Sequence, residues 1–177
     1  MCDINIQYDL KSGLVFCEEM KFYKLDIPKE KSELDLLHYE IRMLNNILPL
    51  MRLSVGDRTI KNACLESFLM HARNLIDFLE DKRNGADDIT CADFLNQTGQ
   101  KIPAINVPLS SGLKNKINKH LSHITRKRLS KKPLWNYDLI AKIINKKLGD
   151  FFVQVSDSYF PTKGSRSRED FSILLIK

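Results

Sequence analysis

Apolar residues recur at helical spacing along most of the chain. In residues 31–53 they repeat every three or four positions, which predicts one buried stripe on a helix. The stripe consists of Leu37, Ile41, Leu44, Leu48 and Met51. This helix is expected to start with a capping box of Ser32 and Asp35, or with Glu33 and Asp35 near its positive end, and Asp57 is placed to cap the next helix.

The same spacing predicts four main helices, separated by short breaks and one proline-containing loop. Their ranges are 31–53, 58–83, 113–129 and 134–156. Gly85 in "NGADD" is the expected terminator of the second helix, and a short helix is expected over "TCADFLNQ". With only 7 glycines and 6 prolines in 177 residues, the pattern predicts an all-α fold: one domain over residues 1–177, a bundle of about four to five helices.

The two ends of the chain, residues 1–30 and 157–177, are less regular. Ile4, Ile6, Tyr8 and Leu10 alternate with polar positions, which is compatible with a short strand that pairs with the tail "FSILLIK".

Several classes of protein are disfavoured by composition. No apolar run approaches the roughly 20 residues that a membrane-spanning helix needs, and the acidic N-terminus does not resemble a secretory signal. The four cysteines form no close pair, so neither a disulfide framework nor a metal site is expected. We therefore expect a cytoplasmic protein with reduced thiols and without a cofactor.

Charge is distributed unevenly. Residues 1–93 contain 12 basic and 17 acidic side chains, residues 94–137 contain 9 basic and no acidic ones, and residues 138–177 contain 7 and 5. We call residues 94–137 the basic segment. A block of one sign attracts anions, so RNA or another polyanion is the expected partner, although a merely solvated lysine-rich face is equally compatible with the charge.

The predicted helix 113–129 in the basic segment carries two histidines. Its apolar stripe consists of Leu113, Ile117, Leu121 and Ile124. Along one border of that stripe, within roughly 60° on a helical wheel, lies a set that we call the histidine face: Lys116, His120, His123 and Lys127. The candidate binding residues around it are Lys114, Asn115, Lys119, Arg126, Lys127 and Arg128.

Imidazole beside fixed cations suits cleavage of a phosphodiester without metal. A neutral His123 or His120 takes a proton from the ribose 2′-hydroxyl, and Lys116 holds the phosphate. Neighbouring lysines favour the neutral form of a histidine, because they disfavour a second positive charge. The simpler interpretation is that His120 covers the edge of the core and His123 is solvated.

"KNKINKHLSHIT", late in a small all-helical chain, resembles the signature of the HEPN superfamily. The family motif is an arginine, often followed by a polar residue, then four to six residues and a histidine. Two registers fit, Lys116 with His123 and Lys114 with His120, the latter with Asn115 at the family's polar position. The resemblance implies a helical bundle that homodimerises, and a metal-independent ribonuclease of a bacterial toxin or defence system.

Lysine replaces the motif's arginine in both registers and lacks its planar, bidentate grip on phosphate. Non-catalytic binding of nucleic acid or nucleotide, or regulatory binding of an acidic protein, therefore stays open. "LESFLMHARNLIDFLED" together with "HLSHIT" also resembles uncharacterised bacterial proteins, a likeness that implies no activity.

The predicted helix 58–83 supplies a candidate partner for the histidines. His71 lies on its apolar face, which is typical of a core histidine with a satisfied hydrogen bond. The functional alternative is that His71 or Asn74 reaches the later helix and fixes the tautomer of a histidine there. Arg73 and Asp77 are spaced as an ion pair and are expected on the opposite, solvent-exposed side.

Overall fold

The structure is a computed structural model, and it describes residues 7–8, 15–16, 32–53, 57–122 and 134–160. The chain divides into two compact units, residues 1–30 and 31–177. In the first unit, β1 (Gln7–Tyr8) pairs antiparallel with β2 (Val15–Phe16). The strand predicted around Tyr8 is present, with β2 as its partner. The tail "FSILLIK" lies outside the described residues.

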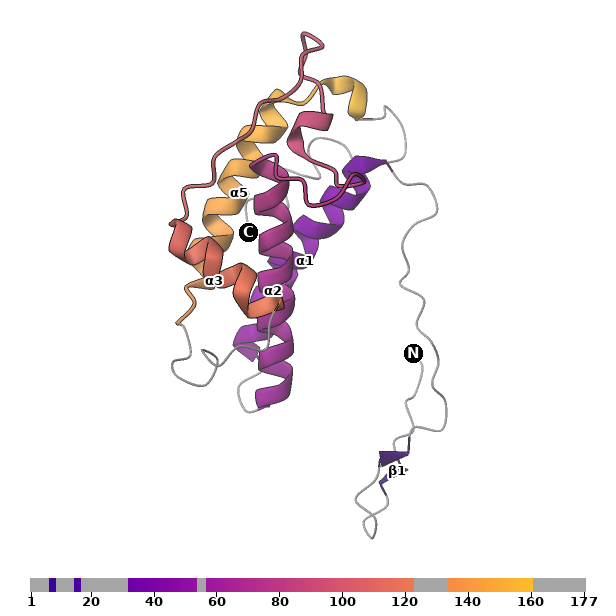
Figure 1. The fold of residues 1–177 in the computed structure, drawn as a ribbon. Helices are drawn as coiled ribbons and strands as arrows, with labels where there is room; N and C mark the ends of the chain where they lie inside the picture. Colours follow the sequence, from indigo (N-terminus) through magenta and orange to yellow (C-terminus); the bar gives the residue numbers. More distant parts are fainter. Residues whose placement is uncertain (1–6, 9–14, 17–31, 54–56, 123–133, 161–177) are drawn as a thin grey trace. The chain divides into compact units, whose positions relative to one another are not determined.

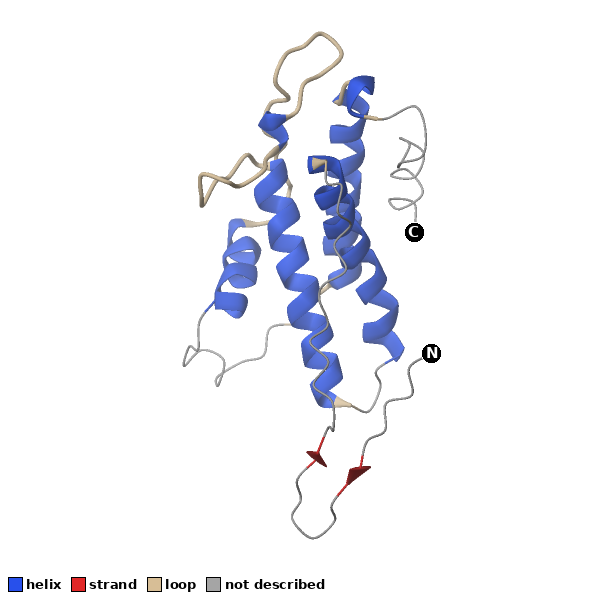
Figure 2. Cartoon of the chain, turned by 90° about the vertical axis from the view of Figure 1, so that its right-hand side faces the viewer, coloured by secondary structure: helices blue, strands red, loops and turns tan. Residues whose placement is uncertain are grey.

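The second unit is all-α in its described residues, as predicted (Figure 1, Figure 2). Its helices are α1 (Glu33–Leu53), α2 (Arg58–Leu79), α3 (Ser111–Ser122) and α5 (Tyr137–Gln154). Two single 3₁₀ turns, Cys91–Asp93 and Asp157–Tyr159, complete it. α2 contacts α1, α3 and α5, and α1 also contacts α5. The helix expected over "TCADFLNQ" is therefore only a 3₁₀ turn, and α3 is described only as far as Ser122.

The core lies where the apolar stripes of α1, α2 and α5 meet. Ile41, Leu44 and Phe68 are fully buried, and Ile117 of α3 joins them. At one end of the core Phe94 from the loop packs edge-to-face against Phe151 of α5, with ring centroids 5.4 Å apart. This packing fixes the long loop between α2 and α3 to the bundle, because aromatic pairs of this geometry stabilise beyond their buried area.

Two amides form a polar contact inside this core. Asn145 of α5 donates to the side-chain oxygen of Asn45 on α1 at 2.9 Å, and Asn45 donates back at 3.4 Å. Each amide thus compensates for the other's loss of water, which is the condition for burying a polar group.

The two predicted helix starts are confirmed. The Asp35 carboxylate accepts from the backbone N–H and hydroxyl of Ser32, both at 3.2 Å. The Asp57 carboxylate accepts from the N–H groups of Thr59 at 2.8 Å and Ile60 at 3.1 Å, before α2. Both contacts satisfy N–H groups that have no partner inside their helix.

The predicted end of α2 is wrong. The helix stops at Leu79 rather than at residue 83, and Asp81 instead of Gly85 adopts the left-handed conformation, with φ of +53°. The N–H of Lys82 then donates to the carbonyl of Asp77 at 2.9 Å, and that of Asp81 to Phe78 at 3.4 Å. This is the Schellman arrangement, and aspartate tolerates its left-handed residue better than most side chains do.

Candidate functional site on helix α3

Helix α3 presents one face to the bundle and the other to solvent. It begins after Ser110, whose hydroxyl accepts from the N–H of Leu113 at 3.2 Å. Ile117 is buried, whereas Asn115, Lys116 and Lys119 are exposed. Neither Lys116 nor Lys119 has an acidic partner among the described residues. The solvent-facing side of α3 therefore offers two ammonium groups to an anion.

The histidine face is only partly within the described residues. His120 belongs to α3, but its side chain is not described. His123, Arg126, Lys127 and Arg128 lie outside the described residues. Lys116 occupies the exposed position that the predicted site requires. The grouping of the two histidines with Lys116 and Lys127 stays a prediction.

Lys114 has a different environment from its neighbours. Its ammonium group donates to the Glu80 carboxylate just beyond the end of α2, and only 18% of the Lys114 side chain is exposed. Lys82 donates to the other oxygen of Glu80 at 2.6 Å. The N–H of Val107 donates to the same oxygen as Lys114, at 3.1 Å. Lys114 is thus engaged in attaching α3 to α2. Lys116 is the better placed of the two candidate phosphate ligands.

The cluster around Glu80 determines its protonation. Burial by itself would raise the pKa of this carboxyl, but hydrogen bonds from Lys114, Lys82 and the Val107 N–H outweigh it and hold the pKa below its usual value. Glu80 is therefore ionised at neutral pH. The basic segment contains no acidic side chain, and Glu80 supplies the carboxylate that pairs with its Lys114.

His71 and Asn74 both contact α1. The Nδ1 atom of buried His71 lies 2.8 Å from the Glu40 carboxylate, and Asn74 donates to the same oxygen at 3.1 Å. Because an ionised carboxylate only accepts hydrogen bonds, Nδ1 carries the hydrogen. The core interpretation of His71 is confirmed. The role of His71 or Asn74 in orienting a histidine of the later helix stays a prediction.

Arg73 and Asp77 of α2 lie beside α3, although the sequence pattern placed them on the solvent side. They do form the predicted ion pair, with Arg73 Nε 3.5 Å from Asp77 Oδ2. However, only 19% of the Asp77 side chain is exposed, and burial raises the pKa of its carboxyl despite the opposing influence of Arg73 and Lys82. Both residues line a small cavity together with Lys114 and Ile117 of α3. The expected solvent exposure is therefore wrong for Asp77.

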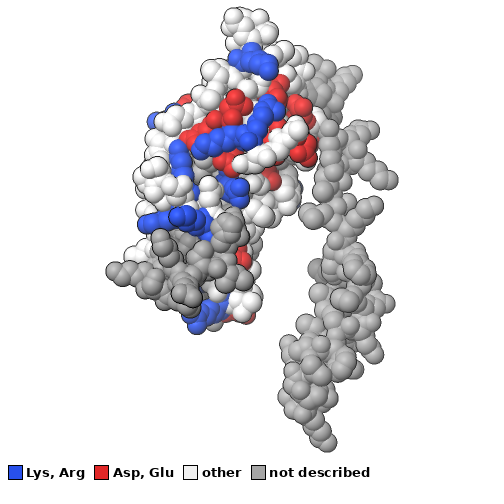
Figure 3. Space-filling view, viewed as in Figure 1, with Lys and Arg blue, Asp and Glu red and all other residues white. Residues whose placement is uncertain are grey.

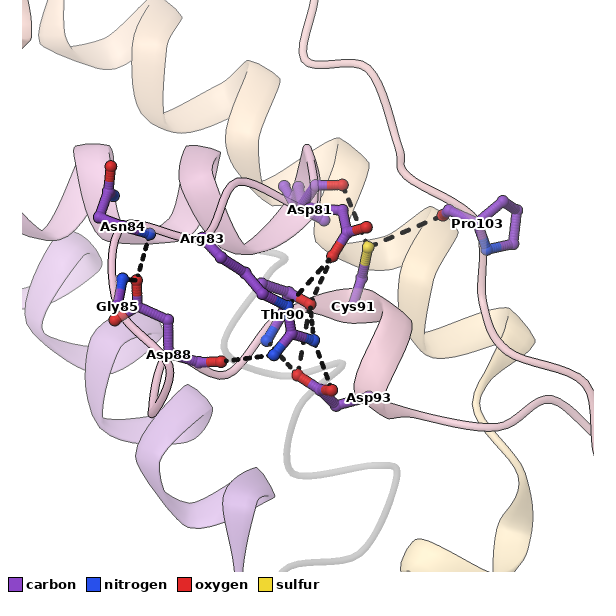
Figure 4. Close-up of polar contacts among 10 residues, drawn as sticks. Asp81, Arg83, Asn84, Gly85, Asp88, Thr90, Cys91, Asp93 and Pro103 are labelled. Carbon is purple, nitrogen blue, oxygen red and sulfur yellow. Dashed lines mark hydrogen bonds and ion pairs between the residues drawn. The ribbon is translucent and has the colours of Figure 1, made fainter.

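The loop after α2 is held by Arg83 (Figure 4). Its guanidinium donates to Asp93 at 2.5 Å, to the hydroxyl of buried Thr90 at 3.0 Å and to the carbonyl of Asp88 at 3.1 Å. The Asp88 carboxylate in turn accepts from the N–H groups of Asn84 at 2.6 Å and Gly85 at 2.8 Å. These bonds fix the loop next to α2, where its residues form the rim of a groove.

Charges of both signs cover the face that carries α2 and α3 (Figure 3). Lys and Arg side chains are spread over it, while Asp and Glu gather mainly in its upper part. Within the described residues no group of three or more His, Cys, Asp or Glu side chains is arranged to hold a metal ion. Nor does any described helix combine the length and apolar character that crossing a bilayer requires.

Comparison of the chain with protein-family models, with curated proteins and with solved structures gives no match. Function is therefore inferred from the residues and their geometry.

Proposed function

We propose that this protein binds single-stranded RNA through the exposed side of α3, and that it cleaves the RNA without a metal in the manner of HEPN ribonucleases. The observation that carries the proposal is the pair Lys116 and Lys119, both exposed and without an acidic partner among the described residues. They lie in a basic segment that contains no acidic side chain. Ammonium groups of this kind bind phosphate and release counterions, which is the main source of non-specific affinity for nucleic acids.

The location of these lysines supports the cleavage part of the proposal. Lys116 is seven positions before His123, the spacing of the family's motif, and α3 belongs to an all-α unit. Phosphodiester cleavage of this type needs a base near the 2′-hydroxyl and a cation near the phosphate. His123, with His120 beside it in sequence, would supply the first and Lys116 the second.

Non-catalytic binding is the second candidate function. It is favoured by the lysine at the position of the motif's arginine, because an ammonium group does not form the bidentate contact of a guanidinium. It requires the same surface and the same ligand, so binding and cleavage are tested separately. The family resemblance further implies a homodimer, which light scattering of the purified protein would check.

Binding is tested by titrating a fluorescent single-stranded RNA with protein at several salt concentrations. We expect affinity to fall steeply with salt, and the double variant Lys116→Ala/Lys119→Ala to bind more weakly. For single strands each phosphate contact contributes roughly 0.7 to the slope of log K against log salt. Losing two contacts should therefore reduce the slope by about 1.4.

The matched control is Lys142→Ala/Lys146→Ala, which removes two exposed lysines from α5. It should bind RNA as the unmodified protein does. If RNA does not bind even at low salt, the proposal is wrong and an acidic protein becomes the better candidate partner. If the two double variants are equally weakened, the effect reflects net charge and not α3.

A further inference from the structure

A groove crosses α2 between α1 and α3. Its widest part is an open cavity of about 430 Å³, within the size range of small-molecule sites. Phe78 and Ile89 give it an apolar lining, and its polar groups come from α2 and the loop that Arg83 holds. These polar residues are Arg73, Asn74, Asp77, Lys82, Asn84 and Asp88.

Two smaller cavities extend the groove in opposite directions. One shares Asn74, Phe78 and Ile89 with it and continues to Glu33 and Glu40 of α1. The other shares Arg73, Asp77 and Lys82 and continues to α3, where Lys114 and Ile117 line it. We call these three cavities, which share lining residues, the α2 groove. It leads from the helix of the candidate RNA site into a recess with amide and carboxylate groups.

The two ends of the α2 groove differ in charge. At the α3 end are the ammonium groups of Lys82 and Lys114, which both donate to Glu80, and the guanidinium of Arg73, which is paired with the Asp77 carboxylate. Arg73 uses Nε for Asp77, so among the described residues its terminal nitrogens remain for another acceptor. At the α1 end the charged lining groups are carboxylates, those of Glu33 and Glu40. Between these ends, the side chains of the loop residues Asn84 and Asp88 line the main cavity. An occupant therefore needs an anionic group toward Arg73 and hydrogen-bond donors toward Asn84 and Asp88.

A nucleotide of an RNA strand has this polarity. Its phosphate is the anionic group, its base has apolar faces, and the exocyclic amino groups of cytosine, adenine and guanine are donors. Carboxylate and amide oxygens are the protein groups that accept hydrogen bonds from such amino groups. Uracil has a carbonyl oxygen where cytosine has its amino group, and a carboxylate cannot donate to it.

We propose that the α2 groove binds one nucleotide of the RNA held by α3 and selects a base with an exocyclic amino group. The phosphate lies beside Arg73, the base lies against Phe78 and Ile89, and the oxygens of Asn84 and Asp88 accept from the amino group. This inference rests on the proposed function, since α3 holds the rest of the strand. Cytosine over uracil is the sharpest form of the preference, because their hydrogen-bonding edges differ while their ring sizes match.

The test compares binding of oligocytidylate and oligouridylate of eight nucleotides, both fluorescently labelled, to the full chain at one low salt concentration. We expect oligocytidylate to bind about tenfold more tightly, in the range of a good base contact. Asp88→Asn and Asn84→Ala should reduce the ratio of the two affinities toward one. Arg73→Gln should weaken binding of both oligonucleotides several-fold and leave the ratio unchanged.

Matched controls are available on the same elements. Asp87→Asn changes the exposed neighbour of Asp88, and Arg42→Gln changes an exposed arginine of α1. Neither residue lines the groove, so both variants should retain the preference. Asp88→Asn keeps an oxygen for the N–H groups of Asn84 and Gly85. If it nevertheless fails to fold, Asn84→Ala, which leaves all backbone donors in place, tests the second of the two proposed acceptors of the amino group.

A second measurement separates this inference from the proposed function. Cytidine and uridine monophosphates are titrated separately into isotope-labelled protein, and amide shifts are followed by NMR. Equal affinity for the two oligonucleotides, with groove variants that behave like the controls, would overturn the groove and leave RNA binding by α3 standing. If neither oligonucleotide binds, the proposed function fails. Shifts at groove residues with the cytidine nucleotide alone would then support the groove, and their absence would overturn it.

Discussion

Replacing His123 with alanine is expected to reduce RNA cleavage by about 100- to 10,000-fold, the usual loss when a general acid or base is removed. Affinity for RNA should change little, because the lysines of α3 provide most of the electrostatic attraction. In the expected reaction the 2′-oxygen loses its proton to the imidazole and attacks the phosphorus. The bond from phosphorus to the 5′-oxygen breaks, and that oxygen takes up a proton from water or from the second, protonated imidazole. The products are a 2′,3′-cyclic phosphate and a free 5′-hydroxyl. Cleavage should therefore persist in EDTA and require the 2′-hydroxyl.

The assay uses purified protein and mixed-sequence single-stranded RNA, with the variant measured alongside. Equal cleavage by both proteins would mean that another residue or a contaminant is responsible. Absence of cleavage by both, with binding retained, would identify a non-catalytic binding protein. Lys116→Arg is the complementary variant and should raise the rate, because it provides the bidentate phosphate contact that lysine lacks.

Replacing Glu80 with alanine is expected to lower the free energy of unfolding more than replacing any other charged residue on the surface between α2 and α3. It leaves the ammonium group of Lys114 and the N–H of Val107 without their acceptor. We expect a loss of about 2 kcal/mol, below the roughly 3–5 kcal/mol for a fully buried pair, since both side chains retain some exposure. A thermal melt should show Tm lower by roughly 4–8 °C.

Glu66→Ala on the exposed side of α2 is the matched control and should leave Tm nearly unchanged.

Glu80→Gln should abolish part of the acid sensitivity of the fold. The folded-state pKa of Glu80 is lowered, so its contribution to stability is present above its usual value of 4.5 and is lost as the pH falls through the folded pKa. Denaturant titrations should therefore show different free energies of unfolding for the unmodified protein and Glu80→Gln at pH 7. This difference should narrow as the pH falls below 4.5. A gap that stays constant with pH would contradict this role.

The helical fold is predictable because its determinants are local. The stripe containing Ile41 and Leu44 repeats at helical spacing, and Asp57 lies two and three residues from the N–H groups it caps. The end of α2 is less predictable, because Asp81 and Gly85 both tolerate a left-handed backbone. Glycine is the usual choice, but the carbonyls of Asp77 and Phe78 are instead satisfied when the chain turns at Asp81.

The candidate site is less predictable than the fold because its contacts join distant parts of the chain. Lys114 and Lys116 both flank Asn115, and the engagement of Lys114 depends on Glu80, which is 34 residues earlier in the chain. Arg73 and Asp77 have the spacing of a solvent-exposed pair. Their position opposite α3 depends on how two helices pack, which a helical wheel of α2 alone does not contain.

The reciprocal contact between Asn45 and Asn145 has a consequence for the order in which the bundle assembles. α1 and α2 are separated by a short connection and can pair early, whereas α5 closes a much longer loop before it docks. If α5 docked one turn out of register, a shift of about 5.4 Å, the two hydrogen bonds between Asn45 and Asn145 would be lost. We therefore expect the pair to favour the native register of α5 over a register shifted by one turn. Asn145→Leu should remain helical by circular dichroism but give broadened side-chain NMR signals, as several registers of α5 become populated. A spectrum as sharp as that of the unmodified protein would show that apolar packing alone aligns α5.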